Sequence, residues 1–451
     1  MLPLFLPVTQ TPPKDKVSEL ILREMKRLKT PGLTLTVVRN GKLVRKGAYG
    51  LSDVELNVKA DYEDVFEIGS ITKQFTAAGL LLLVEDGKLS LDDPVGKWLD
   101  DVPAAWKDIQ LRSLAHQTSG IPDYAFVPGL GIVENFDRAT WMTKMAALPM
   151  DFPTGVAWGY SNSNYALLGW VIEKASGQPY TKFMGDRVLK PLGLTKTKFA
   201  DGLPVTRRAH GYLFNEGKLY LSTPMGGSIQ SDGTLLSTAG DMAKWDAAIR
   251  TRKLLKPTSY DEWFSPARLA SGRTRPYGMG WFLAAPKMPA YNGHGGNSSG
   301  YGAGIARFDK DKLTVIVLTN VYPFPGEALA RSVAEVIDPS LKPTTPVPIA
   351  TDPDPARTER VKAAIAALAA NNPDETLLEP EVSAPMLTER AKRSTAFAPL
   401  AKLDSVLYCG ATPEGRDTWL TYRIKAGDRS WTALLLWSNE NKLAQIVLRR
   451  A

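Results

Sequence analysis

Ser70 and Lys73 are the two residues of this sequence whose types and spacing point most directly to chemistry. They open a long apolar run, 74–84, so a helix that begins near Ser70 would bring Lys73 round one turn onto the face of the serine. A serine hydroxyl becomes an effective nucleophile when a nearby base takes its proton, and the positive end of a helix favours the alkoxide. The pattern therefore predicts a nucleophilic serine beside an amine. An N-cap serine followed by a solvated lysine is the alternative.

A polar turn at 158–164 supplies a phenol and an amide, those of Tyr160 and Asn162. A tyrosine hydroxyl aimed at Ser70 could carry the serine proton if Lys73 shares that proton. The Asn162 amide offers both a donor and an acceptor to a carbonyl or amide of a substrate. Taken alone, the turn is better explained as an ordinary N-cap turn of the helix that follows it, with a packed tyrosine.

Glycine is concentrated in a third segment, 292–302, which contains His294, Gly295, Gly296 and Asn297. So much glycine ahead of a strand-like run indicates backbone that another molecule approaches closely. An edge strand here could pair with an extended substrate, while a backbone N–H stabilises a tetrahedral oxyanion. A flexible loop is the alternative for the same composition.

Hydrophobic periodicity predicts the elements that must position these three segments. Helical spacing appears at 17–28, from Ser70 to about Glu85, at 165–174 and at 327–336. Two hairpins are predicted, 33–38 with 43–49 around Asn40-Gly41, and 302–308 with 313–319 around 309–312. The two hairpins could share one sheet, with the first and last helices on a face and a helical region between them. We therefore expect an α/β (α+β) fold, an antiparallel sheet flanked by helices plus a helical subdomain, with Ser70 where the two meet.

Proline crowds the segment 339–355, which predicts a stiff linker between two domains. We expect a flexible N-terminus at 1–13, a first domain at 14–338 and a small C-terminal α+β domain at 356–451. The C-terminal domain should hold helices at 361–369 and 387–396 and strands at 403–409, 418–426, 430–438 and 443–448. It carries no cluster of reactive side chains, so an accessory or interaction role is the prediction.

The overall composition is that of an ordinary globular enzyme: 451 residues, 44% hydrophobic and 23% charged. The net charge of +8 is spread along the sequence without a basic run, which disfavours a nucleic-acid partner. Cys409 is the only cysteine, so no intrachain disulfide can form. No stretch approaches the roughly 18 uninterrupted apolar residues of a membrane span.

The motifs Ser70-Ile71-Thr72-Lys73, Tyr160-Ser161-Asn162 and His294-Gly295-Gly296, in that order, resemble those of the serine β-lactamase and penicillin-binding-protein superfamily. The most similar members are class C β-lactamases, D-alanyl-D-alanine carboxypeptidases, D-aminopeptidases and the related family VIII-type esterases. The resemblance covers about residues 14–338. Supporting stretches are Pro31-Gly32-Leu33, 114–122, Gly226-Gly227, 236–242 and 277–281.

The resemblance implies a β-lactamase-like fold and an acyl-enzyme formed on Ser70, with Lys73 and Tyr160 handling the proton. It also implies an oxyanion hole from the backbone N–H groups of Ser70 and Asn297, with Asn162 holding the acyl side of the substrate.

The third motif departs from the family pattern, because many members have Lys-Thr-Gly where this chain has His294-Gly295-Gly296. A mostly neutral histidine anchors a substrate carboxylate less well than lysine does. Arg273 or Arg275 could supply the missing charge, but we expect both to be surface residues. His116 is expected to be a satisfied core residue, and His210 has no partner that the sequence identifies.

Three rival interpretations can be weighed. Gly296-Asn297-Ser298-Ser299-Gly300 matches the nucleophile elbow of α/β-hydrolases, but strand-like residues follow it and all three histidines precede Ser298. No metal-ligand spacing appears among the histidines and the cysteine, so no metal is predicted. The third interpretation is a non-catalytic scaffold that kept the fold, which the presence of all three motifs disfavours.

We therefore predict a serine hydrolase with no cofactor, acting on a small ester, amide, peptide or β-lactam. Esterase or amidase/peptidase action on short acyl or D-amino-acid substrates comes first, and a β-lactamase or D-Ala-D-Ala carboxypeptidase second. The resemblance favours a periplasmic or secreted location, with the cytoplasm and self-association left open.

Overall fold

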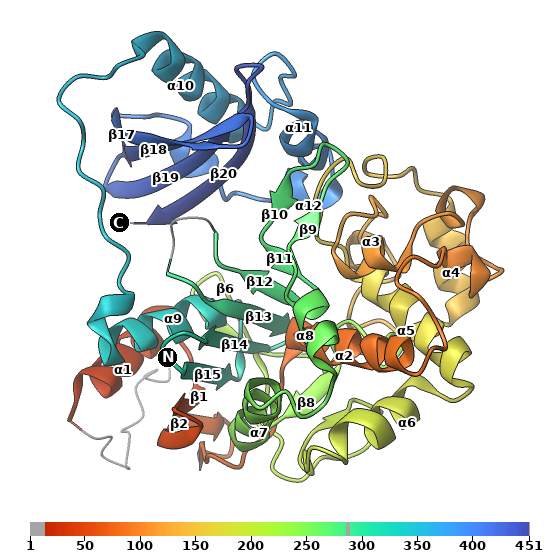
Figure 1. Cartoon of the computed structure of the whole chain (residues 1–451). Helices are drawn as coiled ribbons and strands as arrows, with labels where there is room; N and C mark the ends of the chain where they lie inside the picture. Colours follow the sequence, from red (N-terminus) through yellow and green to blue (C-terminus); the bar gives the residue numbers. More distant parts are fainter. Residues whose placement is uncertain (1–13, 286–288, 451) are drawn as a thin grey trace.

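The chain forms a mixed α/β body with a smaller sheet domain above it, as Figure 1 shows. This computed structural model describes residues 14–285 and 289–450. The N-terminus predicted to be flexible, 1–13, lies outside the described residues. The α/β (α+β) class expected from the sequence is confirmed, including the antiparallel sheet flanked by helices and the small C-terminal sheet domain.

An eight-stranded sheet in the order β11-β12-β13-β14-β15-β1-β2-β3 is the centre of the body. Both predicted hairpins belong to it, because β1 pairs with β2 on one side and with β15 on the other. The turn between β1 and β2 has positive φ at Asn40 (52°) and Gly41 (72°), the geometry that a two-residue hairpin requires. The strands are β1 (Gly32–Arg39), β2 (Lys42–Asp53), β3 (Val58–Lys59), β11 (Tyr277–Gly278), β12 (Trp281–Leu283), β13 (Asn292–Ser298), β14 (Tyr301–Phe308) and β15 (Leu313–Thr319).

Alternate residues of the sheet enter two different hydrophobic cores, one on each face. Val315 and Val317 of β15 pack with helices α1 (Lys16–Leu28) and α9 (Gly326–Ile337). Ile316 and Leu318 pack on the other side, with α2 (Thr72–Glu85) and α7 (Ala239–Arg250). Burial on both faces explains why every residue of β15 is apolar or threonine.

Most of the helices form a region beside the sheet, between β3 and β11 in the chain (Figure 1). Helix α2 lies at its centre and is buried from Thr72 to Leu83, which accounts for the long apolar run after Ser70. It packs against α5 (Asn162–Ser176) and α8 (Pro257–Trp263). The other helices are α3 (Leu111–Ala115), α4 (Arg138–Ala146) and α6 (Tyr180–Met184).

Three short sheets complete the body: β4-β8-β5, β16-β6-β7 and β9-β10. Their strands are β4 (Phe66–Glu67), β5 (Lys198–Phe199), β6 (Tyr212–Asn215), β7 (Lys218–Leu221), β8 (Leu235–Ser237), β9 (Ala267–Arg268), β10 (Thr274–Arg275) and β16 (Val321–Tyr322).

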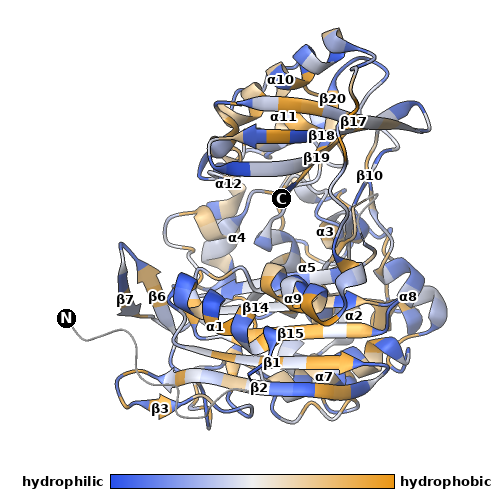
Figure 2. Ribbon diagram, turned by 90° about the vertical axis from the view of Figure 1, so that its left-hand side faces the viewer, coloured by the Kyte–Doolittle hydropathy of each residue, from blue (hydrophilic) through white to orange (hydrophobic). Residues whose placement is uncertain are grey.

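The C-terminal domain is a four-stranded meander, β17 (Ser405–Glu414), β18 (Asp417–Ala426), β19 (Arg429–Trp437) and β20 (Leu443–Arg450). Its apolar side packs on α10 (Pro355–Ala369), and in Figure 2 the sheet stands clear above the central one. The helix predicted over 387–396 is wrong in extent. Thr388 caps a single turn, α12 (Glu389–Lys392), and a separate helix α11 (Pro380–Met386) precedes it.

A buried ion-pair cluster joins the two domains, which corrects the expectation that Arg273 and Arg275 lie at the surface. Arg273 pairs with three carboxylates of the C-terminal domain, those of Asp417 (2.8 Å), Glu381 (2.8 Å) and Glu379 (3.5 Å). Arg275 is 7% exposed and donates to the carbonyl of Ala444 and to the Gln445 side chain. Sequence analysis missed this because the partners lie more than 100 residues away.

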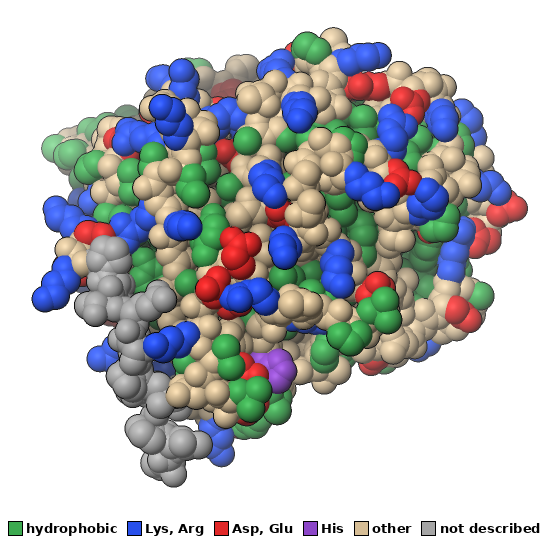
Figure 3. Space-filling model, turned by 90° about the horizontal axis from the view of Figure 1, so that it is seen from below, with side chains coloured by type: hydrophobic (Ala, Val, Ile, Leu, Met, Phe, Trp, Pro, Cys, Tyr) green, Lys and Arg blue, Asp and Glu red, His purple; other side chains and the backbone are tan. Residues whose placement is uncertain are grey.

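Charged side chains elsewhere are interspersed. On the face shown in Figure 3, lysine and arginine alternate with aspartate and glutamate and do not gather into one patch. Among the described helices, none is both long and apolar enough to cross a membrane.

Candidate active site

Ser70 lies in a 3₁₀ turn, Gly69–Ile71, that leads directly into α2. Lys73 sits one turn further on, as its spacing predicts, and its Nζ donates to Ser70 Oγ at 3.1 Å. The serine is partly exposed, whereas the lysine is completely buried. A hydroxyl that solvent can reach is thus hydrogen bonded to an amine that solvent cannot reach.

All three N–H bonds of the Lys73 ammonium have an acceptor. Besides Ser70 Oγ, they reach Asn162 Oδ1 at 2.8 Å and the backbone carbonyl of Asp232 at 2.7 Å. Ser70 is three residues from Lys73, and the other two acceptors come from segments about 90 and 160 residues away. The lysine therefore links the serine turn, the start of α5 and the loop before β8.

The side chain of Asp123 fixes the orientation of the Asn162 amide. Asn162 donates from its backbone N (3.2 Å) and its Nδ2 (3.1 Å) to Asp123 Oδ1, which leaves Oδ1 of the amide for Lys73. Asp123 is 7% exposed and also accepts from Ala125 N. Sequence analysis did not select Asp123, although it directly follows the supporting stretch 114–122.

Tyr160 lies beside the lysine, in the turn before α5. The centroid of its ring is 4.9 Å from Lys73 Nζ, and the ring packs near Trp158, Tyr277 and His294. The structure thus brings together Ser70, Lys73, Tyr160 and Asn162, residues that the sequence places in separate segments.

Strand β13 passes directly against the serine turn, and two glycines permit the contact. Gly69 has φ of +52°, and a Cβ there would lie 2.6 Å from Asn297 N. A Cβ at Gly296 would lie 1.9 Å from the carbonyl oxygen of Ile68. The backbone of Asn297 therefore lies next to the turn that carries Ser70, and Asn297 Oδ1 accepts from Phe324 N at 3.1 Å.

The part of β13 near the serine has a free edge among the described residues. Strand β12 pairs only with Asn292 and Gly293, whereas β14 pairs along the whole of β13. Gly295 and Asn297 line the pocket next to Ser70, and Gly296 is turned away against Ile68. Ser298 is followed by a turn into β14 and not by a helix, so the segment is not a nucleophile elbow.

His294 is 1% exposed, and burial lowers its pKa to about 3, so the ring is neutral at pH 7. Its Nδ1–H donates to the carbonyl of Gly295 at 2.6 Å, and the Tyr277 hydroxyl lies 3.3 Å from Nε2. A ring held in this way presents no positive charge to a ligand.

A buried carboxylate, that of Asp232, lies behind Lys73. Asp232 is 2% exposed, accepts from the Tyr124 hydroxyl at 2.7 Å, and burial raises its pKa. The charge of Lys73 opposes this shift. No motif in the sequence indicates Asp232, because the carboxylate comes next to Lys73 only through the fold.

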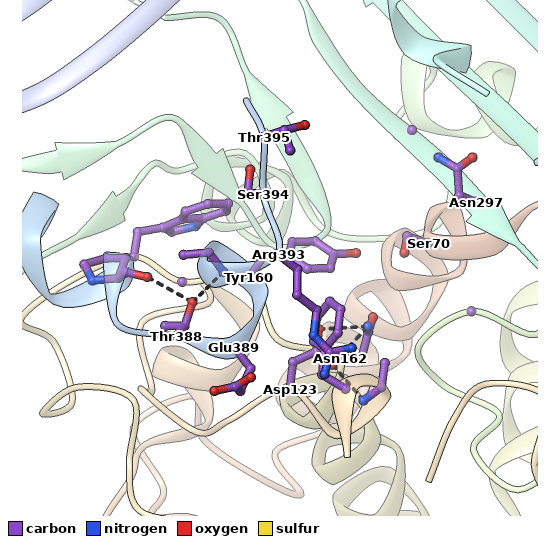
Figure 4. A pocket seen from close by; sticks show the side chains of 18 of the residues that line it. Ser70, Asp123, Tyr160, Asn162, Asn297, Thr388, Glu389, Arg393, Ser394 and Thr395 are labelled. Atoms are coloured by element: carbon purple, nitrogen blue, oxygen red, sulfur yellow. Dashed lines mark hydrogen bonds between the residues drawn. The ribbon is translucent and has the colours of Figure 1, made fainter. Parts of the chain in front are cut away.

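Ser70 opens into a pocket of about 1930 Å³ whose walls come from both domains. The body contributes Tyr160, Asn162, Asn297 and His294, and the C-terminal domain contributes residues from α11, α12, the segment 393–398 and β20. Figure 4 shows Arg393, Ser394 and Thr395 in the same pocket as Tyr160 and Ser70. Asp151 also lines it, and its pKa is raised to about 6 by burial and by the charges of Asp123 and Glu389.

The other two histidines lie outside this arrangement. His116 is buried near the backbone carbonyl of Tyr277, as expected of a core residue. His210 is exposed and pairs with Asp53 at 3.3 Å. Among the described residues, Asp53, Glu55 and His210 lie close enough to share a metal ion, but none of them lines the pocket.

The chain is similar to several known proteins. The beta-lactamase family model matches residues 17–337. Penicillin-binding protein 4* of Bacillus subtilis (strain 168) is 29% identical over 317 residues, which are 64% of this chain and 67% of that protein.

Among solved structures, a D-stereospecific amidohydrolase from Streptomyces sp. is 25% identical, with a TM-score of 0.58 over 68% of this chain and 93% of that one. An octameric penicillin-binding protein homologue from Pyrococcus abyssi shares the fold at 21% identity, with a TM-score of 0.63 over 97% of this chain and 98% of that one. The family match spans both the Ser70 turn and β13, and this chain belongs to the beta-lactamase family.

Proposed function

We propose that the protein is a serine hydrolase that works through an acyl-enzyme on Ser70. The substrates that we favour are esters or amides of short acyl groups or of D-amino acids. The observation that carries the proposal is the hydrogen bond from buried Lys73 to Ser70 Oγ in the wall of the pocket. Family membership supports the hydrolase class, and the similarity to a D-stereospecific amidohydrolase supports the substrate class.

In the proposed reaction Ser70 Oγ attacks the substrate carbonyl while the Lys73–Tyr160 pair takes the serine proton and then passes it to the leaving group; the reactive state of this pair holds one proton fewer than an ammonium and a phenol together. The backbone N–H groups of Ser70 and Asn297 stabilise the tetrahedral oxyanion, an effect of on the order of 3 kcal/mol for each donor. Asn162 holds the acyl side through the amide that Asp123 and Lys73 orient. Water then attacks the acyl-enzyme by the same proton path, which releases the acid.

Because His294 is neutral, the site favours substrates that carry no carboxylate. A β-lactam or a D-Ala-D-Ala peptide carries a carboxylate, and the third motif has no lysine to receive it. An ester needs no such charge and is intrinsically easier to acylate. We therefore place ester or amide hydrolysis ahead of β-lactamase or carboxypeptidase activity, which remains the second candidate because Penicillin-binding protein 4* is among the relatives.

The proposal is tested by intact-mass spectrometry after exposure to a fluorophosphonate, short nitrophenyl esters, D-amino-acid amides and nitrocefin. The wild-type protein should gain one adduct and cleave short esters at least as readily as nitrocefin. Ser70→Ala should lose both the adduct and the turnover, while Ser298→Ala keeps the adduct. Full hydrolysis by Ser70→Ala would show that the nucleophile is assigned wrongly, and no adduct on the wild type would favour a non-catalytic scaffold.

A further inference from the structure

The C-terminal domain forms one wall of the pocket that contains Ser70. More than half of the side chains that it contributes are apolar, among them Val382, Met386, Phe397 and Ile446. The helical region supplies apolar residues to the same pocket, including Phe126, Val127 and Leu148. An apolar group of a ligand bound at Ser70 would thus be enclosed by side chains of both domains.

The two walls are in direct contact at the pocket. The guanidinium of Arg393, in the C-terminal domain, lies over the ring of Phe126 at 5.1 Å from its centroid. Glu389 of α12 is close enough to Asp151 of the body to raise the pKa of that carboxyl. The segment 389–398 is therefore part of the pocket and not a distant appendage.

The pocket is larger than a short substrate needs. Its volume of about 1930 Å³ exceeds the roughly 300–1,000 Å³ of an ordinary small-molecule site. An acetyl ester bound at Ser70 would leave most of this volume unfilled. Each CH₂ group that a longer substrate buries against the wall favours binding by a factor of about 4.

We propose that the C-terminal domain is a specificity element of the enzyme, whose wall at 382–398 selects substrates with a bulky apolar substituent beyond the scissile bond. This inference rests on the proposed function, because it concerns the substrate of the same Ser70 site. It assigns a role in recognition to a domain that carries no reactive cluster of its own. The domain leaves the chemistry at Ser70 unchanged. It selects the substrates that bind at Ser70 in a reactive position.

Bulky substitutions at exposed positions of the wall provide the test, since they fill the pocket without disturbing a core. Ser394→Trp and Thr395→Trp are compared with Asn439→Trp, an exposed residue of the same domain outside the pocket. The readout is the ratio of kcat/KM for nitrophenyl octanoate to that for nitrophenyl acetate, with octyl acetate against ethyl acetate as the leaving-group series.

We expect the long-to-short ratio to fall by about 10-fold or more in one of the two series for Ser394→Trp or Thr395→Trp, equivalent to the loss of two or so buried CH₂ groups. The Asn439→Trp ratio should match the wild type. An unchanged ratio in both wall variants, or equal losses on long and short substrates, would overturn the proposal. Absence of adduct and turnover in the wild-type protein would instead refute the proposed function itself.

Discussion

Asp123 decides which end of the Asn162 amide faces Lys73, because its carboxylate can only accept hydrogen bonds and so takes both N–H groups of Asn162. The oxygen of the amide is then left for the lysine at 2.8 Å. A residue outside the three motifs thereby sets the geometry within them.

Asp123→Asn should therefore reduce kcat/KM for a short ester by about 10- to 100-fold, as expected for the loss of a charged hydrogen bond worth roughly 1.5–3 kcal/mol. Steady-state kinetics measure it, with the rate of fluorophosphonate labelling as a second readout. Asp151→Asn is the control, since it removes a carboxylate from the same pocket and leaves the hydrogen bonds between Asp123 and Asn162 in place. Equal losses in both variants would contradict the orienting role.

His294 should make stability depend on pH. Its pKa is about 3 in the folded protein and about 6.5 when unfolded, so the unfolded chain binds the extra proton between these values. The part of the folding free energy that depends on neutral His294 is fully present above pH 6.5 and is lost as the pH falls towards 3. Its upper limit is on the order of 5 kcal/mol.

We expect His294→Gln to show a smaller decrease in Tm between pH 7 and pH 4.5 than the wild type does, because glutamine binds no proton. Scanning calorimetry at the two pH values measures this. The exposed His210→Gln should behave like the wild type. If His294→Gln leaves the pH dependence of Tm unchanged, then groups other than His294 cause the loss of stability at low pH.

At the scale of elements, the contact between the serine turn and β13 depends on backbone that comes closer than a side chain allows. Gly69 and Gly177 both have positive φ, but a Cβ at Gly69 would meet Asn297 N, whereas a Cβ at Gly177 would meet nothing within 4 Å. Substitution of Gly177 therefore tests the free-energy cost of backbone strain alone, whereas substitution of Gly69 adds the clash with Asn297.

Gly69→Ala should lower kcat for a short ester on the order of 100-fold, because the turn must move relative to Asn297 and a displacement of about 1 Å can cost that much. Gly177→Ala should lose about 1 kcal/mol of stability with its kcat unchanged. Kinetics and urea unfolding of both variants measure the two effects. Full activity in Gly69→Ala would mean that the close approach is not needed.

Periodicity and turn chemistry predicted most of the elements, because those signals lie within a few neighbouring residues. Asn40-Gly41 marked the first hairpin, and the apolar run after Ser70 marked α2. Asp123, Asp232 and the partners of Arg273 could not be found in this way, since each acts on a residue tens to hundreds of positions away. The helix predicted over 387–396 was wrong in extent, because α11 ends at Met386 and Thr388 caps a new turn that ends at Lys392.

At the scale of the whole molecule, the ion-pair cluster at Arg273 holds the C-terminal domain over the pocket. Arg273 is the shared cation of Glu379, Glu381 and Asp417, and hydrogen bonding to Asp417 contributes most to raising the arginine pKa. Removing it leaves three buried carboxylates without their cation, a change that typically costs about 3–5 kcal/mol.

Arg273→Ala should therefore loosen the domain while the Ser70 network stays intact. Hydrogen exchange should increase across 379–398, and the long-to-short ratio should decrease in the series that responds to the wall variants, with fluorophosphonate labelling of Ser70 retained. Arg268→Ala, at a nearby exposed position, should change neither quantity. Unchanged exchange at 379–398 in Arg273→Ala would show that other contacts hold the two domains together.

The position of β1 between β2 and β15 has a consequence for synthesis on the ribosome. Leu33 of β1 pairs with Thr319, so one edge of this early strand waits for almost three hundred further residues to be translated. Until then the nascent chain exposes an apolar, unpaired edge of the kind that seeds aggregation. We therefore expect chaperones to bind the first half of the nascent chain until β15 has been synthesised.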